Sequence, residues 1–132
     1  MAKLTHPCPC GNTLEFEQCC GQYISGSATA PTAEALMRSR YTAYTLKDEP
    51  YVLATWHTST RPEKLELAAD TATKWIGLEV KRHQQQDDTH AIVEFVAKFK
   101  INVRAQRMHE ISNFVKEDRK WFYMDGEFDE SR

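Results

Sequence analysis

The chain has 132 residues, which is enough for one compact domain and a small appended motif but not for two full hydrophobic cores. It is 41% hydrophobic and 27% charged, as is typical of soluble proteins, and it contains no apolar run of about 18 residues, which excludes a membrane-spanning helix. Its formal net charge of -2 argues against a broad nucleic-acid-binding face, because such a face needs concentrated basic residues.

All four cysteines lie between residues 8 and 20, as the run Cys8-Pro9-Cys10-Gly11 followed by the adjacent pair Cys19-Cys20. Thiolates bind zinc in tetrahedral sets of four, and two short pairs joined by a turn can enclose one ion. Gly11 allows the chain to turn back after the second thiol, and a short helical turn can begin at residues 12 and 13. The spacing therefore predicts one zinc ion per chain, bound by all four cysteines.

Disulfide bonds are the alternative for these thiols. Bonds within either short pair would be strained, although bonds between the pairs are sterically open. The N-terminus has no apolar secretory segment, so we expect a reducing, cytoplasmic location, which favours zinc. Four protein ligands leave no coordination position for water, so the metal is expected to be structural. His6 is a spare candidate ligand.

A connector of small and polar residues, 25 to 31, follows the cysteines and ends in a proline. It predicts a boundary between a zinc knuckle, residues 1–26, and a main domain, residues 31–132. Thr32 is a suitable N-cap for a helix that continues to about Leu46. A second helix is predicted from Asp48, with Pro50 in its first turn, to about His57, and a short third segment within residues 63 to 69.

Arg40 lies on the apolar face of the first predicted helix. Ala33, Leu36, Met37, Tyr41 and Tyr44 share this face at 100° per residue. A buried arginine requires an acidic partner or several carbonyl acceptors. We considered two roles: a structural one, in which Arg40 pairs with Glu94, Glu110 or Asp125, and a functional one, in which it reaches into a ligand cavity.

From Trp75 onward the apolar period changes to two, which indicates strands. A strand beginning near residue 75 precedes a polar turn at residues 84 to 89. The clearest strand covers residues 91 to 101, with its odd-numbered apolar residues on one face, and further strands are predicted at 107 to 116 and 120 to 124. Helices followed by an antiparallel meander predict an α+β fold in which helices cover one face of a sheet.

Two sets of motifs resemble known families. The run Cys8-x-Cys10-Gly11-Asn12, followed by Cys19-Cys20-Gly21, resembles the SEC-C zinc motif of the C-terminal tail of the SecA ATPase, although that tail usually ends in Cys-His. Residues 32–41, 55–62, 93–95 and 109–112 resemble the YchJ family of bacterial proteins. This resemblance implies a SEC-C motif followed by a nuclear transport factor 2-like (cystatin-like) cone, with helices packed on a curved antiparallel sheet. The resemblance implies this architecture, but it provides no established activity that could be carried over to this chain.

Candidate pocket residues are the polar or aromatic side chains expected near the sheet and the helix ends: Arg40, Tyr41, Trp56, His57, Arg61, Glu94, His109, Glu110 and Asp125. Pairing of the two central strands could bring a carboxylate and an imidazole together, which is the minimum for acid-base catalysis and also a common structural pair. The sequence has no nucleotide-binding loop and no second metal-binding pattern.

These features lead to two functional hypotheses. The first is a cytoplasmic zinc-binding accessory protein whose knuckle docks a protein partner. By analogy with the SecA tail, which contacts a chaperone and the ribosome, that partner would belong to the translation or export machinery. The alternative is a small-molecule binder or an enzyme of hydrolase, dehydratase or isomerase type that uses the cone cavity. An open cavity with unpaired polar groups would favour the alternative, and a filled cone with Arg40 fully paired would favour the first.

Overall fold

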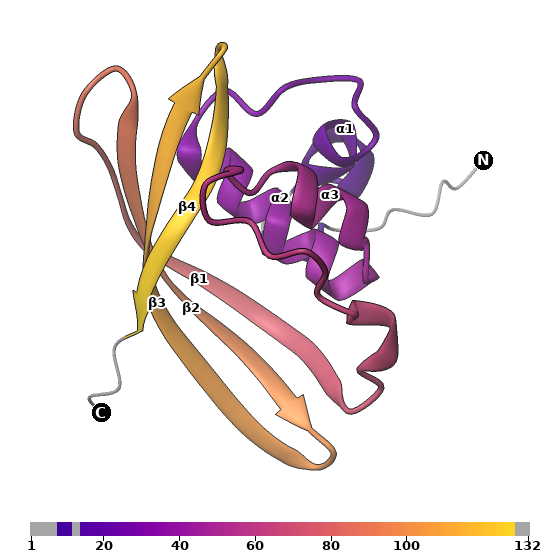
Figure 1. The fold of residues 1–132 in the computed structure, drawn as a ribbon. Helices are drawn as coiled ribbons and strands as arrows, with labels where there is room; N and C mark the ends of the chain where they lie inside the picture. Colours follow the sequence, from indigo (N-terminus) through magenta and orange to yellow (C-terminus); the bar gives the residue numbers. More distant parts are fainter. Residues whose placement is uncertain (1–7, 12–13, 129–132) are drawn as a thin grey trace.

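A computed structural model of the chain describes residues 8–11 and 14–128 (Figure 1). The predicted helical turn at residues 12 and 13 and the spare ligand His6 lie outside these ranges. The elements in chain order are η1 (Phe16–Gln18), α1 (Cys20–Ile24), α2 (Ala33–Leu46), α3 (Glu49–Ala54), η2 (Leu67–Ala69), β1 (Thr73–Gln85), β2 (His90–Ile101), β3 (Arg104–Glu117) and β4 (Lys120–Phe128).

The two main helices begin where their capping residues predicted. The Thr32 hydroxyl accepts a hydrogen bond from the Ala35 amide at the start of α2, and the Asp48 carboxylate caps α3 in the same way. α3 ends at Ala54, three residues before the predicted end. The chain after it instead forms a parallel bridge with β4, in which the His57 amide donates to the Tyr123 carbonyl at 2.8 Å. The predicted third helical segment is a single 3-10 turn, η2.

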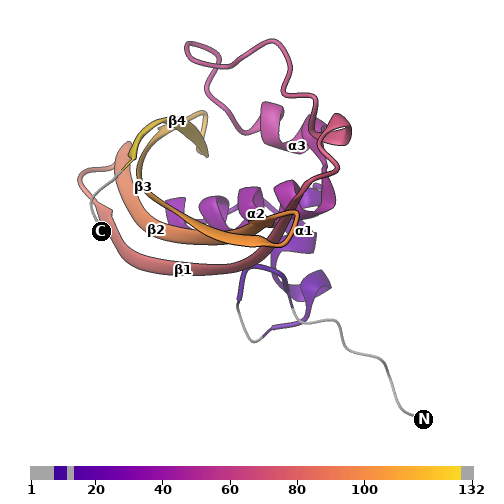
Figure 2. The same cartoon turned by 90° about the horizontal axis from the view of Figure 1, so that it is seen from below.

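The four strands form one antiparallel sheet in the order β1-β2-β3-β4. β1 and β4 extend further than the sequence pattern predicted, to Gln85 and Phe128, because bulges in the ladder interrupt the strict period of two. Seen from below, the sheet curls around α2, so that its concave face holds this helix (Figure 2). The predicted α+β arrangement of helices on a curved antiparallel sheet is confirmed.

The core lies between α2 and the concave face. β2 contributes alternate residues to it, from Ala91 to Ala97, and β3 and β4 contribute Phe114 and Trp121. The opposite, convex face carries Glu94, Lys98 and Lys100 of β2. Among the residues described, no helix is long and apolar enough to cross a membrane.

Candidate functional site

The four cysteines form one buried cluster. Cys8 and Cys10 come from the loop before η1, whereas Cys19 and Cys20 stand at the start of α1. Their sulfur atoms all lie within 4.8 Å of one another. The Sγ atoms of Cys10 and Cys19 are 3.7 Å apart, and those of Cys19 and Cys20 are 3.9 Å apart. The sequence-predicted ligand set is therefore brought together in space.

These distances fit a tetrahedral metal site. Four thiolates at about 2.3 Å from one zinc ion would have sulfur atoms about 3.8 Å apart. The thiols do not ionise alike: hydrogen bonds from Cys10 and Cys20 lower the pKa of Cys8, whereas burial, reinforced by the charge of Cys10, raises the pKa of Cys19 to about 12. Four adjacent buried thiols resist ionising together, and a divalent cation removes that obstacle. The four cysteines could therefore hold a metal ion.

The cysteine cluster packs against the main domain. The Cys8 sulfur lies 3.7 Å from the Thr42 hydroxyl of α2, and Nη1 of Arg38 donates to the Cys10 carbonyl at 2.9 Å. All four cysteines belong to the same hydrophobic cluster as the α2 and sheet residues. The division of the chain into two units stays a prediction, but the two parts share a packed surface.

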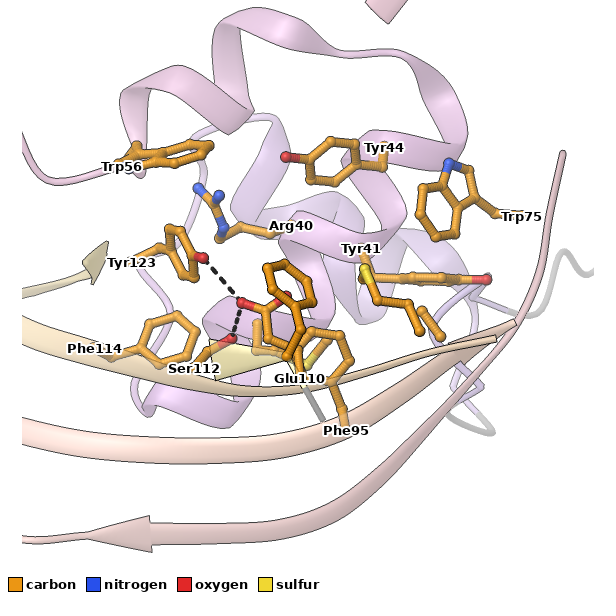
Figure 3. Close-up of a pocket in the computed structure, with 14 residues that line it drawn as sticks. Arg40, Tyr41, Tyr44, Trp56, Trp75, Phe95, Glu110, Ser112, Phe114 and Tyr123 are labelled. Carbon is orange, nitrogen blue, oxygen red and sulfur yellow. Dashed lines mark hydrogen bonds between the residues drawn. The ribbon is translucent and has the colours of Figure 1, made fainter. Parts of the chain in front are cut away.

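A cavity of about 250 Å³ lies between α2 and the concave face of the sheet (Figure 3). Its apolar lining is mostly aromatic and comprises Met37, Tyr41, Trp56, Trp75, Phe95, Ala97, Met108, Phe114 and Phe128. Its polar lining comprises Arg40, Tyr44, Glu110, Ser112 and Tyr123. The cone is therefore open rather than filled, and polar side chains converge on it.

Arg40 is buried as the helical pattern predicted, with 6% of its surface exposed. Its Nη1 donates to the Val52 carbonyl at 2.8 Å and to the Thr55 hydroxyl at 2.7 Å, both at the end of α3. The guanidinium carbon lies 5.1 Å from the centre of the Trp56 ring and 4.6 Å from that of Tyr123. Burial lowers the pKa of Arg40, and neighbouring oxygens, including those of Glu110, oppose this shift.

Of the alternatives considered for Arg40, the ion pair with a carboxylate is wrong. Among the described residues, no carboxylate oxygen comes within 4.0 Å of the guanidinium nitrogens. Carbonyl, hydroxyl and ring acceptors take that place, because the end of α3 lies directly beside the guanidinium. Nε and Nη2 donate to no described residue, and neither atom is sealed from the cavity. Of the five N–H donors of Arg40, only the two on Nη1 are thus used by the described residues.

Glu110 is the buried carboxylate of the cavity, with 5% of its surface exposed. Its Oε2 accepts hydrogen bonds from the Ser112 hydroxyl at 2.7 Å and from the Tyr123 hydroxyl at 2.9 Å (Figure 3). Its Oε1 accepts none from the described residues. Gly126 makes room for this arrangement, since a methyl group at that position would overlap the carboxylate. One oxygen is held and the other is left for the cavity.

The phenols of Tyr44 and Tyr123, in the polar part of the cavity lining, remain protonated donors at neutral pH. Burial raises the pKa of Tyr44, although the Arg40 charge opposes the shift. Burial also raises the pKa of Tyr123, and the adjacent Glu110 carboxylate reinforces that effect. The Tyr123 hydroxyl is used by Glu110, whereas the Tyr44 hydroxyl has no hydrogen-bond partner among the described residues.

Of the sequence-predicted pocket residues, Arg40, Tyr41, Trp56 and Glu110 line the cavity. Glu94 and His109 do contact each other, at 2.7 Å, but on the convex face, where Glu94 also pairs with Arg82. The register explains this outcome. Phe95 pairs with Glu110, so Glu94, one residue away, must point to the opposite face. The predictions that Glu94 lines the pocket and that it pairs with Arg40 are therefore wrong.

Three other predicted pocket residues also lie outside the cavity lining. His57 bonds to the Glu117 carboxylate at 2.6 Å and to the Ser59 hydroxyl at 2.8 Å, and thereby ties the loop after α3 to the end of β3. Arg61 donates to the Trp56 carbonyl. The Asp125 carboxylate accepts a hydrogen bond from the side-chain amide of Asn113, its neighbour across β3 and β4.

Sequence reasoning did not select Tyr44, Ser112 or Tyr123 as pocket residues. A signal existed for each of them. Tyr44 is one turn beyond Arg40 on the apolar face of α2, and Ser112 is two residues from Glu110 on the same side of β3. Tyr123 follows the buried Trp121 by the same interval. Extending the period from Arg40 and Glu110, and from the buried Trp121, would have found all three.

Comparison with known proteins gives the family. Residues 32–126 match the family model of the YchJ, middle NTF2-like domain. A UPF0225 protein of Cupriavidus pinatubonensis is 55% identical over 127 residues, covering 92% of this chain and 87% of that protein. The solution structure of a SEC-C motif containing protein from Rhodopseudomonas palustris matches with a TM-score of 0.82 at 31% identity, covering 92% of this chain and 98% of that one. The crystal structure of another, from Psychrobacter arcticus, matches with a TM-score of 0.76 at 32% identity, covering 97% and 84%. The chain therefore belongs to the YchJ (UPF0225) family and has its nuclear transport factor 2-like fold.

Proposed function

We propose that this protein binds a small molecule in the cavity between α2 and the sheet. The observation that carries the proposal is Arg40, a buried cation with no carboxylate partner among the described residues and with two nitrogens open to the cavity. Taking a guanidinium out of water costs several kcal/mol unless its donors are used. A ligand that accepts hydrogen bonds from Arg40 would supply what the fold leaves out.

The lining defines the chemistry of that ligand. Rings such as Trp56, Trp75 and Phe95 favour a flat, apolar body, and the volume of about 250 Å³ suits a molecule of one or two rings. Arg40 favours a carboxylate or another oxygen acceptor at one end. Glu110 stands in the same cavity, so a donor group elsewhere on the ligand is tolerated, whereas a second negative charge is not.

Naphthoate is a suitable probe, because it combines two fused rings with one carboxylate. We expect it to change the fluorescence of Trp56 and Trp75, which both line the cavity, and to saturate. Arg40→Met should raise the dissociation constant by about tenfold or more, as loss of a charge-assisted hydrogen bond predicts. Fluorescence titration of wild type and variant measures this directly.

Arg82→Met is the matched control, because Arg82 lies on the convex face with its side chain half exposed. It should bind naphthoate as wild type does. Equal affinity of wild type and Arg40→Met would contradict the proposal. So would failure of naphthoate to protect the protein against thermal unfolding at saturating concentration.

We further propose that Cys8, Cys10, Cys19 and Cys20 hold one structural zinc ion. The support is the spacing of the sulfur atoms, the burial of all four residues and the SEC-C description of the two structural neighbours. Four thiolates would complete the coordination shell, so zinc would stabilise the fold without taking part in a reaction. A cytoplasmic location, where thiols stay reduced, is compatible with such a site.

Docking of a protein partner by the cysteine knuckle is a second candidate function. The observation that favours it is Leu14, an apolar side chain 47% exposed beside the cluster, at the edge of a shallow groove that Gln18 and Tyr23 also line. Such exposure suits a partner surface. The resemblance to the SecA tail points to the translation or export machinery.

Co-sedimentation with ribosomes tests the docking hypothesis. Wild type should sediment with ribosomes at moderate salt, and Leu14→Asp should remain in the supernatant, because a charge would enter an apolar contact. Val103→Asp is the control, since Val103 is an exposed apolar residue in the turn between β2 and β3, far from α1 (Figure 1). Equal sedimentation of all three proteins, or none by wild type, would contradict docking through this surface on ribosomes.

A further inference from the structure

We propose that the cavity catalyses proton transfer from a carbon acid, with Glu110 as the general base and Arg40 as the group that stabilises the negative charge formed. This inference rests on the proposed small-molecule binding in the same cavity and adds a reaction to it. The substrate class is a carbonyl compound with a flat apolar body and an acidic C–H next to its carbonyl group.

The geometry of Glu110 suits a base. Its Oε2 is held by two hydroxyl donors, Ser112 at 2.7 Å and Tyr123 at 2.9 Å, and this fixes the orientation of the carboxylate. Its Oε1 accepts no hydrogen bond from the described residues and is not sealed from the cavity, so it can approach a C–H group. Phe95, Phe114 and other apolar lining residues limit its hydration. A fixed, poorly hydrated carboxylate removes a carbon-bound proton more readily than one in water.

The complementary group is Arg40. Its Nε and Nη2 donate to no described residue, and the Tyr44 hydroxyl, kept protonated by burial, is a third donor without a described partner. The guanidinium needs little reorganisation during the reaction, because Val52 and Thr55 already hold its Nη1 in place. An oxygen that gains negative charge during a reaction would be stabilised there more than a neutral carbonyl would be. A base and an oxyanion-binding group thus line one aromatic cavity.

The reaction balances without a redox partner. Oε1 of Glu110 takes the proton, the C–H electron pair forms a carbon–carbon double bond, and the carbonyl π electrons move to oxygen as an enolate. Return of the proton from the Glu110 carboxylic acid to the same carbon gives exchange, and return to a conjugated carbon gives an isomer. No oxidant, reductant or water is consumed.

A structural role for the two charges is the alternative. Glu110 would then act by partly neutralising Arg40 within the core, a role that its electrostatic effect on Arg40 supports. However, a purely structural pair should form direct hydrogen bonds, and among the described residues Arg40 and Glu110 each bond to other groups. Both also leave atoms open to the cavity.

A nitrobenzisoxazole serves as the probe, because its ring opens in one step when a base removes its single acidic C–H proton. The N–O bond breaks in that step and a coloured phenolate forms, so Arg40 would stabilise the new charge. We expect wild type to open the ring with saturation kinetics, and Glu110→Gln to be slower by about a hundredfold or more, as loss of a general base predicts. Absorbance of the phenolate gives the rate, and naphthoate should inhibit it.

Two further variants separate catalysis from folding. Gly126→Ala keeps the glutamate but displaces its carboxylate, so it should also be slow. Glu94→Gln removes a carboxylate of the convex face and should react as wild type does. Circular dichroism checks that each variant is folded. If Glu110→Gln does not fold, Gly126→Ala supplies the test.

The outcomes distinguish this inference from the binding it rests on. Ring opening that is lost in Glu110→Gln and Gly126→Ala but kept in Glu94→Gln supports proton transfer. Naphthoate binding together with a wild-type rate no greater than that of Glu110→Gln overturns proton transfer and leaves small-molecule binding in place. A wild type that neither binds naphthoate nor opens the ring overturns both.

Discussion

Replacement of Cys10 and Cys19 by serine is expected to abolish metal binding and to lower the Tm of the whole chain by more than about 10 °C. The reason is packing. Cys8 contacts Thr42 of α2, the Cys10 carbonyl accepts from Arg38, and all four cysteines share one cluster with the sheet core. Loss of about 2–3 kcal/mol of this packing is enough for that shift in a chain of this size. If the domain boundary predicted at the connector separated two independent folding units, only the N-terminal segment would unfold.

Metal analysis and thermal melting check this expectation together. Wild type purified without chelator should carry one zinc ion per chain, and chelation should lower its Tm about as much as the double substitution does. Leu14→Ser, beside the cluster but exposed, should change neither quantity. Wild type without zinc, or zinc retained by the double variant, would refute the four-cysteine site. A main transition unchanged on chelation would show that the knuckle and the main domain fold independently.

The local rules predicted much of the fold. Thr32 and Asp48 mark the starts of α2 and α3 because their side chains satisfy amides at the first turn, a short-range effect visible in sequence. The strands followed from the period of two. The end of β4 did not, because a bulge opposite Asn113 and Phe114 interrupts that period. The end of α3 did not either, because a bridge between Trp56 and Tyr123 joins residues far apart in the chain. Such contacts leave no local pattern.

The site was less predictable than the fold. Helical periodicity placed Arg40 in the core, but its acceptors lie on another helix, so sequence alone suggested a carboxylate partner instead. Pairing of the central strands correctly joined Glu94 to His109 without indicating the face. That choice depends on register, and a shift of one residue would exchange Glu94 for Phe95. The position of Glu110 in the cavity has the same origin.

Arg40→Ala is expected to cost about 3 kcal/mol of unfolding free energy, whereas Arg40→Met should stay within about 1 kcal/mol of wild type. Alanine would leave a void beside the Trp56 and Tyr123 rings, on which the guanidinium now lies. Methionine fills much of that volume, and it removes the desolvated charge along with its hydrogen bonds. Urea unfolding of the two variants measures the difference.

The comparison of stability with binding decides what Arg40 is for. Arg40→Met that is as stable as wild type but fails to bind naphthoate means that the buried charge is kept for a ligand, since the fold does not need it. Arg82→Met should cost less than about 1 kcal/mol, as an exposed ion pair does, and provides the scale for a dispensable arginine. Arg40→Ala as stable as wild type would mean that the guanidinium does not occupy the core in solution. The cavity would then lose the cation around which its ligand chemistry is argued.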